Sequence, residues 1–216
     1  GTVTAKGKGA GFLAEPQKLD QFLDQIFSKL DMKISIKTRI GTHYEEDWEY
    51  LLAIYEKYPI HELIIHPRIQ TDMYRGVPRL GAYEKAVNRL KMPLCYNGNL
   101  FSAADYKRIT ERFPDTCCFM YGRGLITNPG LVTEIREGIR PDKKTVREFH
   151  DCLFEEYREL LSGERNVLFR MKELWSYMAV NFTNYEKYAK KIKKSQHLSE
   201  YSSVVSSLFA EQDLID

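Results

Sequence analysis

Short apolar segments alternate with helical segments through the first two thirds of the chain, and this alternation constrains the fold more than any other feature. Continuous apolar strands that alternate with helices are typical of a parallel sheet covered by helices. The strand starts recur at roughly 30 residues, which is the unit spacing of a (β/α)8 barrel. We expect strands at residues 34–37, 62–66, 93–96 and 116–121. The predicted fold class is therefore α/β, a partial TIM barrel that keeps the last four β/α units with parallel strands.

The segments between these strands have apolar residues on one face, as amphipathic helices do. Ser102 is a candidate N-cap with Asp105 at the capping-box spacing, and Asn128 with Pro129 is expected to start another helix. Residues 1–11 are rich in glycine and lysine, so we expect a loop there. The other helices are predicted at residues 16–30, 47–58 and 82–90.

The pattern changes after Arg140, where only helical periodicity continues. We therefore expect residues 1–139 to form the C-terminal half of a TIM barrel and residues 140–216 to form a separate helical domain, which has the size of a small domain. The helices of this domain are predicted at residues 143–161, 166–182, 184–194 and 199–209.

Charge is nearly balanced overall, at a formal +2, but it is uneven along the chain. Residues 165–194 hold eight Lys and Arg against two acidic residues, whereas residues 195–216 hold four acidic residues and no Lys or Arg. A basic segment of this kind suits a polyanionic partner. It could equally be a solvated helix face, and tyrosines and tryptophans within it could stack on bases or fill the helical core.

The four cysteines form no C-x-x-C pair, which favours a reducing, cytoplasmic setting over a disulfide framework. Cys95, Cys117 and Cys118 lie in the apolar runs, where cysteine usually behaves as a small buried hydrophobe. No apolar run has the length of a membrane span. His66 has no second histidine at metal-ligand spacing, so no metal site is predicted.

Polar and glycine residues follow the predicted strands at the carboxyl ends, where parallel barrels gather functional side chains. The stretch 93–131 contains two glycine-bearing turns before helix starts, which suits a split cradle for a phosphate. Lys37 and Arg39 could also be ordinary strand-end charges, and His66 could serve a local backbone hydrogen bond. The strand-end residues are Lys37, Arg39, His66, Arg68, Asn97, Asn99, Gly122 and Arg123.

Five short motifs occur in an order and spacing that resemble the tRNA-dihydrouridine synthase family. Any one of them is unspecific, but five in register make a strong match, and further family-like residues at Arg170-Met171-Lys172 and Trp175-Ser176-Tyr177 extend the resemblance over residues 3–178. The motifs are Lys6-Gly7-Lys8-Gly9-Ala10-Gly11, Ile36-Lys37-Thr38-Arg39-Ile40-Gly41, His66-Pro67-Arg68, Asn97-Gly98-Asn99 and Gly122-Arg123-Gly124.

The resemblance implies an FMN-dependent enzyme with a TIM barrel and a helical domain, which reduces uridines in tRNA with NADPH as electron donor. Lys37 would lie against the flavin pyrimidine edge and His66 beside the flavin, where a fixed cation stabilises reduced flavin. Asn97, Gly98, Asn99, Gly122 and Arg123 would hold the FMN phosphate. The residues expected at the tRNA are Arg39, Arg68, Arg75, Arg170, Lys172, Lys190 and Lys191, with loop support as a second role for Arg68 and Arg75.

The chain departs from the family pattern in three respects. Asn99 stands where the family often has aspartate, and Pro67 where glycine is common. The proton-donating cysteine of the family lies in a Gly-Cys-Pro motif that would precede Val3, and none of the four cysteines matches it. We therefore expect no catalytic proton donor within these residues, and weak or no activity from them alone.

Three functions remain open on the sequence. The first is the C-terminal part of a tRNA-dihydrouridine synthase, whose open half-barrel would expose sheet edges and favour self-association. The second is a non-catalytic RNA-binding protein derived from that family. The third, a half-barrel enzyme for a small sugar phosphate, makes no use of the basic helical segment.

Overall fold

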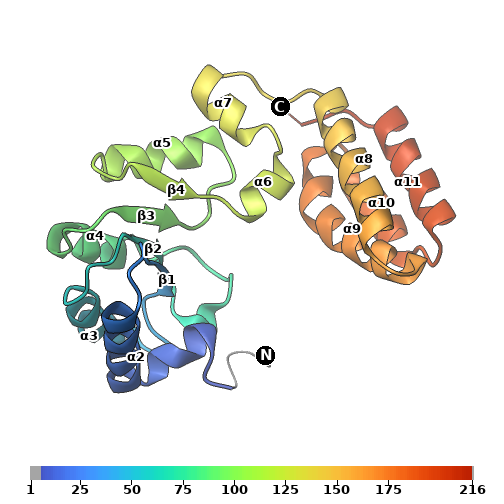
Figure 1. The fold of residues 1–216 in the computed structure, drawn as a ribbon. Helices are drawn as coiled ribbons and strands as arrows, with labels where there is room; N and C mark the ends of the chain where they lie inside the picture. The colour runs from blue at the N-terminus through green and yellow to red at the C-terminus, as the bar shows by residue number, and fades with distance from the viewer. Residues whose placement is uncertain (1–5, 216) are drawn as a thin grey trace. The chain divides into compact units, whose positions relative to one another are not determined.

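The computed structural model describes residues 6–215 (Figure 1). These residues group into two compact units by their contacts. The first unit comprises the described part of Gly1–Asn99 together with Lys107–Tyr121, and the second comprises Leu100–Tyr106 with the described part of Gly122–Asp216. The assignment of residues 1–139 to a half-barrel domain and of residues 140–216 to a separate helical domain stays a prediction.

A four-stranded parallel sheet organises the first unit, as the alternating pattern predicts (Figure 1). The strand order β1-β2-β3-β4 follows the chain order, because each strand pairs with the next one along the sequence. The strands are β1 (Ser35–Arg39), β2 (Glu62–His66), β3 (Leu94–Asn97) and β4 (Cys118–Met120).

Helices cover one face of this sheet. Thr38, Ile65 and Tyr96 hold matching positions on three neighbouring strands and are all buried. The Thr38 hydroxyl bonds the Tyr55 hydroxyl of α3 at 2.8 Å, and the Tyr96 ring packs edge to face on Tyr83 of α4 with centroids 5.1 Å apart. The helices of this unit are α2 (Pro16–Lys29), α3 (Asp47–Tyr55), α4 (Leu80–Arg89) and most of α5 (Ala103–Arg112).

The opposite face of the sheet carries the alternate residues of each strand. Lys37, Ile64, Cys95 and Cys118 are paired across the four strands and form one row on this face. Within the row Lys37 is exposed, Ile64 and Cys118 are half-buried, and Cys95 is buried. This face therefore offers polar and sulfur-bearing side chains rather than a purely aliphatic surface.

Several boundaries in the first unit differ from the predictions. The first strand begins later, at Ser35, and continues through Arg39, because Thr38 and Arg39 keep pairing with β2. Residues 9–11 belong to a 3-10 helix, η1 (Gly9–Ala14), and not to a loop. The last strand is confined to Cys118–Met120, so the prediction of a buried Cys117 is wrong: this side chain precedes β4 and is exposed.

The predicted helix start at Asn128 and Pro129 is also displaced, to Leu131. Asn128 ends a short helix, α6 (Arg123–Thr127), which the sequence analysis did not predict. Its side-chain oxygen accepts a hydrogen bond from the Gly130 N–H at 3.0 Å, which makes a turn and not an N-cap. The next helix, α7 (Leu131–Glu137), therefore begins after this turn.

The second unit is helical apart from an isolated bridge between Phe182 and Leu214. Its longest helix, α8 (Lys143–Leu160), is capped by Asp142, whose carboxylate accepts a hydrogen bond from the Thr145 N–H at 2.7 Å. The elements that follow α7 are α8 (Lys143–Leu160), α9 (Glu164–Met178), η3 (Ala179–Asn181), α10 (Tyr185–Lys194) and α11 (Leu198–Glu211).

A core rich in aromatic side chains stabilises this helical unit. Trp175 is 1% exposed and donates a hydrogen bond from its indole nitrogen to the Tyr201 hydroxyl at 2.6 Å. Phe182 and Phe209 pack edge to face with centroids 5.1 Å apart. Of the two roles open for Trp175 and Tyr188, both of which are buried, packing in the core is the one that the structure supports. Within residues 6–215 no helix is both long and apolar enough to cross a membrane.

Candidate functional site

The carboxyl ends of the strands in the first unit bring several predicted site residues to one edge of the sheet. Arg39 and His66 are paired at the ends of β1 and β2, and Asn97 ends β3. Lys37 lies two residues before Arg39 on the same strand face. Surrounding protein atoms partly desolvate the Lys37 amine and lower its pKa, and the charge of Arg39 lowers it further. This face of the sheet therefore combines the Lys37 amine within β1 with an imidazole and an amide at the carboxyl ends of β2 and β3.

The Asn97-Gly98-Asn99 turn after β3 is held by both of its asparagines. The Asn97 amide donates to the Met120 carbonyl at 2.8 Å, which ties the turn to β4. Asn99 has a positive φ of 45°, a conformation that asparagine tolerates better than most residues. A Cβ on Gly98 would lie 3.1 Å from Pro78 Cγ, so only glycine fits here without displacing its neighbour.

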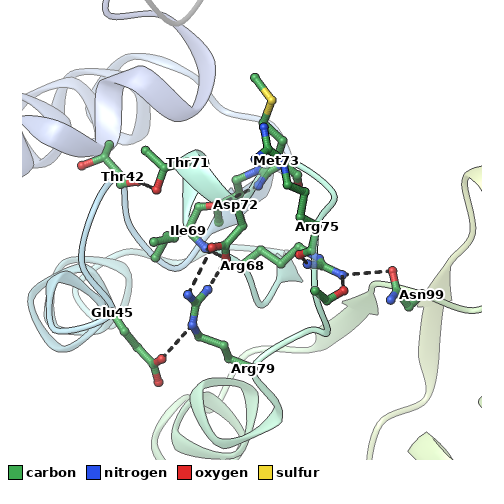
Figure 2. A network of polar contacts seen from close by, with 12 residues as sticks. Thr42, Glu45, Arg68, Ile69, Thr71, Asp72, Met73, Arg75, Arg79 and Asn99 are labelled. Atoms are coloured by element: carbon green, nitrogen blue, oxygen red, sulfur yellow. Dashed lines mark hydrogen bonds and ion pairs between the residues drawn. The ribbon is translucent and has the colours of Figure 1, made fainter.

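Arg68 is fully buried, although the sequence analysis expected it at the tRNA. Its guanidinium donates to the Arg75 and Gly76 carbonyls, the latter at 2.7 Å, and to the Asn99 side-chain oxygen at 3.2 Å (Figure 2). A buried side chain in these contacts cannot meet a nucleic acid directly. The structure therefore favours the second role foreseen for Arg68, which is support of the loop that follows β2.

Two further arginines hold the same segment, residues 67–79, which we call the β2–α4 loop. Arg39 donates to the Ile69 carbonyl at 2.8 Å and to the Met73 carbonyl at 3.0 Å. Arg79 lies between the carboxylates of Asp72 and Glu45, with the Glu45 contact at 3.0 Å (Figure 2). The sequence analysis did not single out Arg79, because nothing local in the sequence shows that it faces two acidic groups.

The β2–α4 loop presents apolar side chains to solvent. Met73, Tyr74 and Val77 are 57%, 60% and 79% exposed. The Tyr74 ring stacks near the His66 ring with centroids 6.1 Å apart, and the Arg39 guanidinium lies 5.7 Å from the Tyr74 centroid. An exposed aromatic ring between a histidine and an arginine is a surface on which a planar group can stack. The sequence offers only a weak signal for Tyr74, its position in a loop after a strand end.

A cavity of about 610 Å³ borders the edge strand β1. Its walls combine apolar side chains, such as Phe12, Phe22 and Ile36, with the cations of Lys37 and Arg39. The glycine-rich segment Gly7–Ala10 forms another part of the wall. The cavity is large enough for a small ligand, since such sites usually occupy about 300–1,000 Å³.

Gly122 and Arg123, the other predicted phosphate ligands, belong to the second unit. Gly122 is exposed and precedes α6, and a Cβ placed on it would meet no atom within 4 Å. Arg123 is the first residue of α6, and its guanidinium lies 5.3 Å from the centroid of the Phe101 ring.

The predicted RNA-facing cations of the second unit have different surroundings. Lys172 is half-buried and donates to the Ser195 carbonyl, and Arg170 pairs with Glu173 at 3.0 Å. Helix α10 buries Tyr188 and Ile192 and exposes all of its lysines, none of which has an ion-pair partner among the residues that the structure describes. We call this surface the α10 lysine face; it consists of Lys187, Lys190, Lys191, Lys193 and Lys194.

Comparison with known proteins gives one consistent family. Residues 1–212 match the family described as dihydrouridine synthase (Dus). The chain is 25% identical to a probable tRNA-dihydrouridine synthase 1 of Synechocystis, an alignment that covers 99% of this chain and 59% of the relative. It is 26% identical to tRNA-dihydrouridine synthase B of Pasteurella multocida, over 65% of this chain and 42% of the relative.

A third relative, tRNA-dihydrouridine(16) synthase of Shewanella oneidensis, is 29% identical over 67% of this chain and 46% of its own length. The chain thus spans about half the length of the curated relatives that it matches. Because the family match covers nearly every residue, the resemblance of the five motifs is confirmed. The chain belongs to the dihydrouridine synthase family.

Proposed function

We propose that this chain forms the flavin-binding and RNA-binding part of a tRNA-dihydrouridine synthase, an oxidoreductase that reduces uridine in tRNA with FMN and NADPH. The observation that carries the proposal is that Lys37, His66 and Asn97 lie on the same face of a parallel sheet, with His66 and Asn97 at the carboxyl ends of their strands. These residues lie in a chain that matches the dihydrouridine synthase family over residues 1–212. The names of the relatives supply the substrate class.

The residues at this edge fit FMN in their chemistry. A bound flavin needs a positive charge near its pyrimidine ring, and the exposed side chain of Lys37 is a cation that can supply it. A Cβ at Gly98 would lie 3.5 Å from His66 Cδ2, so this turn passes directly beside the imidazole. Lys37, His66, Asn97, Gly98 and Asn99 are the proposed flavin ligands of the first unit.

FMN, when bound, would supply the hydride that reduces C6 of uracil, with NADPH as the source of electrons. The contribution of this chain is positional and electrostatic. Lys37 would hold a positive charge where a reduced flavin carries a negative one. Gly122 and Arg123 stay proposed ligands of the phosphate. The proton for C5 needs a donor that none of Cys95, Cys117, Cys118 and Cys152 provides by its place in the motif order.

The four strands correspond to half of an eight-stranded barrel, so we propose that the first unit is completed by further strands. In the described structure β1 and β4 each pair with a single neighbour, which leaves two sheet edges. Open edges favour association with other strands. A second copy of the chain could fill this role, in which case light scattering would give a dimer. A monomer with a cooperative melt would contradict self-association.

The α10 lysine face is the proposed tRNA contact of the second unit, together with Arg170 and Lys172 of α9. Its lysines are exposed and carry no ion pair among the described residues, so their charges are available to phosphates. The same surface supports a second candidate function, RNA binding without flavin chemistry. This alternative predicts salt-sensitive tRNA binding by a colourless protein.

An FMN titration of the purified chain tests the proposal. We expect yellow protein or saturable quenching of FMN fluorescence, and at least tenfold weaker binding after Lys37→Ala combined with Arg123→Ala. Lys33→Ala is the matched control, because Lys33 is also exposed but precedes β1. Equal FMN affinity in all three proteins would refute the flavin site. Salt-sensitive tRNA binding with no FMN binding would favour the second candidate.

A further inference from the structure

Three metal-binding side chains from three neighbouring strands meet near the amino ends of β2, β3 and β4. Glu62 is the first residue of β2, Cys95 lies in β3, and Cys118 is the first residue of β4. The carboxylate oxygen and the two sulfur atoms all lie within 4.8 Å of one another. No local pattern in the sequence indicates this cluster, because its members are separated by 33 and 23 residues along the chain.

The strand register explains why these side chains meet. Cys95 and Cys118 are directly paired between β3 and β4. Ile64 is paired with Cys95, and Glu62 lies two residues before Ile64, so Glu62 points to the same face of the sheet. A backbone hydrogen bond from Leu63 N–H to the Pro93 carbonyl, at 2.9 Å, fixes the start of this pairing. The three donors are therefore placed by the sheet itself and not by a flexible loop.

The cluster is closed on one side and open on the other. Cys95 is 2% exposed, whereas Cys118 and Glu62 are half-buried. An ion could thus reach the site from the side of Glu62 and Cys118 and keep a water ligand there. The cation in the same row of the sheet, Lys37, does not lie next to the cluster, because Ile64 on the intervening strand separates it from Cys95.

The donor set selects a class of metal ion. Two cysteine sulfurs with one carboxylate suit zinc and ions that resemble it, whereas magnesium and calcium prefer oxygen donors alone. A tetrahedral zinc site with Zn–S bonds of about 2.3 Å places its sulfurs roughly 3.8 Å apart. The three donor atoms lie within 4.8 Å of one another, so an ion requires them to approach by at most about 1 Å.

We propose that Glu62, Cys95 and Cys118 form a binding site for a zinc-class divalent metal ion, with water as a fourth ligand. Each thiol gives up its proton when the ion binds, so the cysteines bind as thiolates and protons are released to solvent. The site lies at the opposite strand ends from His66 and Asn97. Such an ion would link three neighbouring strands and stabilise the sheet.

Cobalt titration of the reduced, metal-free chain provides the first test. We expect a thiolate-to-cobalt charge-transfer band that saturates at a single ion and disappears when zinc is added. Glu62→Gln should bind at least tenfold more weakly, and Cys118→Ala should lose the band. The matched controls are Cys117→Ala and Cys152→Ala, since both cysteines are exposed and lie outside the cluster. An unchanged band in Cys118→Ala, or an equal loss in a control, would overturn the proposal.

Alkylation of the unmutated chain provides a second readout that does not depend on whether variants fold. Zinc should protect Cys118 from a thiol-alkylating reagent, while the exposed Cys117 and Cys152 are modified equally with and without zinc. Mass spectrometry of the peptides distinguishes the three positions. Equal modification of Cys118 in both conditions would overturn the proposal.

Discussion

The Arg68 guanidinium donates to the Asn99 side-chain oxygen at 3.2 Å and so links the β2–α4 loop to the turn after β3. The same guanidinium binds the Arg75 and Gly76 carbonyls. One buried cation thus holds two segments that both border the carboxyl edge of the sheet. The loop and the turn are expected to lose order together if this cation is removed.

Arg68→Lys should lower the free energy of unfolding by about 2–3 kcal/mol, because an ammonium cannot reach the acceptors that the planar guanidinium satisfies together. Hydrogen exchange at residues 75–77 should become faster in the same variant. Urea unfolding and exchange measured by mass spectrometry check the two effects. Arg75→Lys is the control on the same loop, since the Arg75 side chain is exposed. Equal stability of the two variants would contradict the assigned role.

Asp72 should make the stability of the first unit depend on pH in acid. Hydrogen bonds from Arg79, the larger cause, and from the Ile69 N–H lower the pKa of the Asp72 carboxyl. A lowered pKa in the folded state adds stability above the unfolded pKa of about 3.9, and this stability is lost as pH falls through the folded value.

Asp72→Asn should therefore destabilise the protein by roughly 1–2 kcal/mol at pH 7, and the difference from the unmutated chain should shrink below about pH 4. Urea unfolding across this range measures the difference. Asp115→Asn, at an exposed position, is the control and should have little effect at any pH. A pH-independent loss of stability in Asp72→Asn would show that the carboxylate charge is not the cause.

His150 should make the helical unit sensitive to a milder decrease in pH. Because the Asp151 carboxylate can only accept, His150 Nδ1–H donates to it at 2.7 Å, and Nε2 of the neutral ring accepts from the Tyr201 hydroxyl at 2.6 Å. Burial lowers the pKa of His150, although Asp151 partly opposes this. The neutral, buried form therefore adds stability above the unfolded pKa of about 6.5, which is lost as pH falls below it.

We expect the free energy of unfolding of this unit to fall as pH decreases below about 6.5, and His150→Gln to remove that decrease while lowering stability at pH 7. Trp175 fluorescence in a Trp48→Phe background reports on this unit, since the chain has two tryptophans and Trp48 lies in the other unit. His197→Gln, at an exposed position, should keep the decrease. Its persistence in His150→Gln would assign it to another group.

The α10 lysine face should set the salt dependence of tRNA binding. Changing Lys190, Lys191, Lys193 and Lys194 together to glutamine removes four exposed charges without touching the buried Tyr188 and Ile192. We expect weaker binding and a slope of log affinity against log salt that is smaller by up to roughly three.

Filter binding or fluorescence anisotropy at several salt concentrations measures this change. The matched control replaces Lys18, Lys29, Lys33 and Lys91, which are exposed lysines of the first unit, and removes the same charge. An equal reduction of the slope in both variants would indicate general charge attraction. An unchanged slope in the α10 variant would exclude this helix as the RNA contact.

Much of the fold was predictable because its signals are local. The apolar run at Glu62–His66 matches β2 without error, and the amphipathic period of residues 16–30 matches α2 to within one residue. The strand-end position of His66 and Asn97 follows from the same pattern, since parallel strands present their carboxyl ends at one edge, whereas Lys37 lies two residues before the end of β1. Element ends were predicted less accurately where a non-local contact or a turn sets them. Pairing with β2 extends β1 to Arg39, and the turn at Asn128 delays the start of α7.

What the sequence by itself determined is the family, the parallel order of the strands and the residues at their carboxyl ends. The tertiary structure decided which charged side chains are buried and which cysteines lie close together. Arg68 is buried in the β2–α4 loop although it looks like an RNA-binding cation, because only the path of that loop brings the Arg75 and Gly76 carbonyls to it. Glu62, Cys95 and Cys118 meet only through the strand register, which no local pattern in the chain encodes.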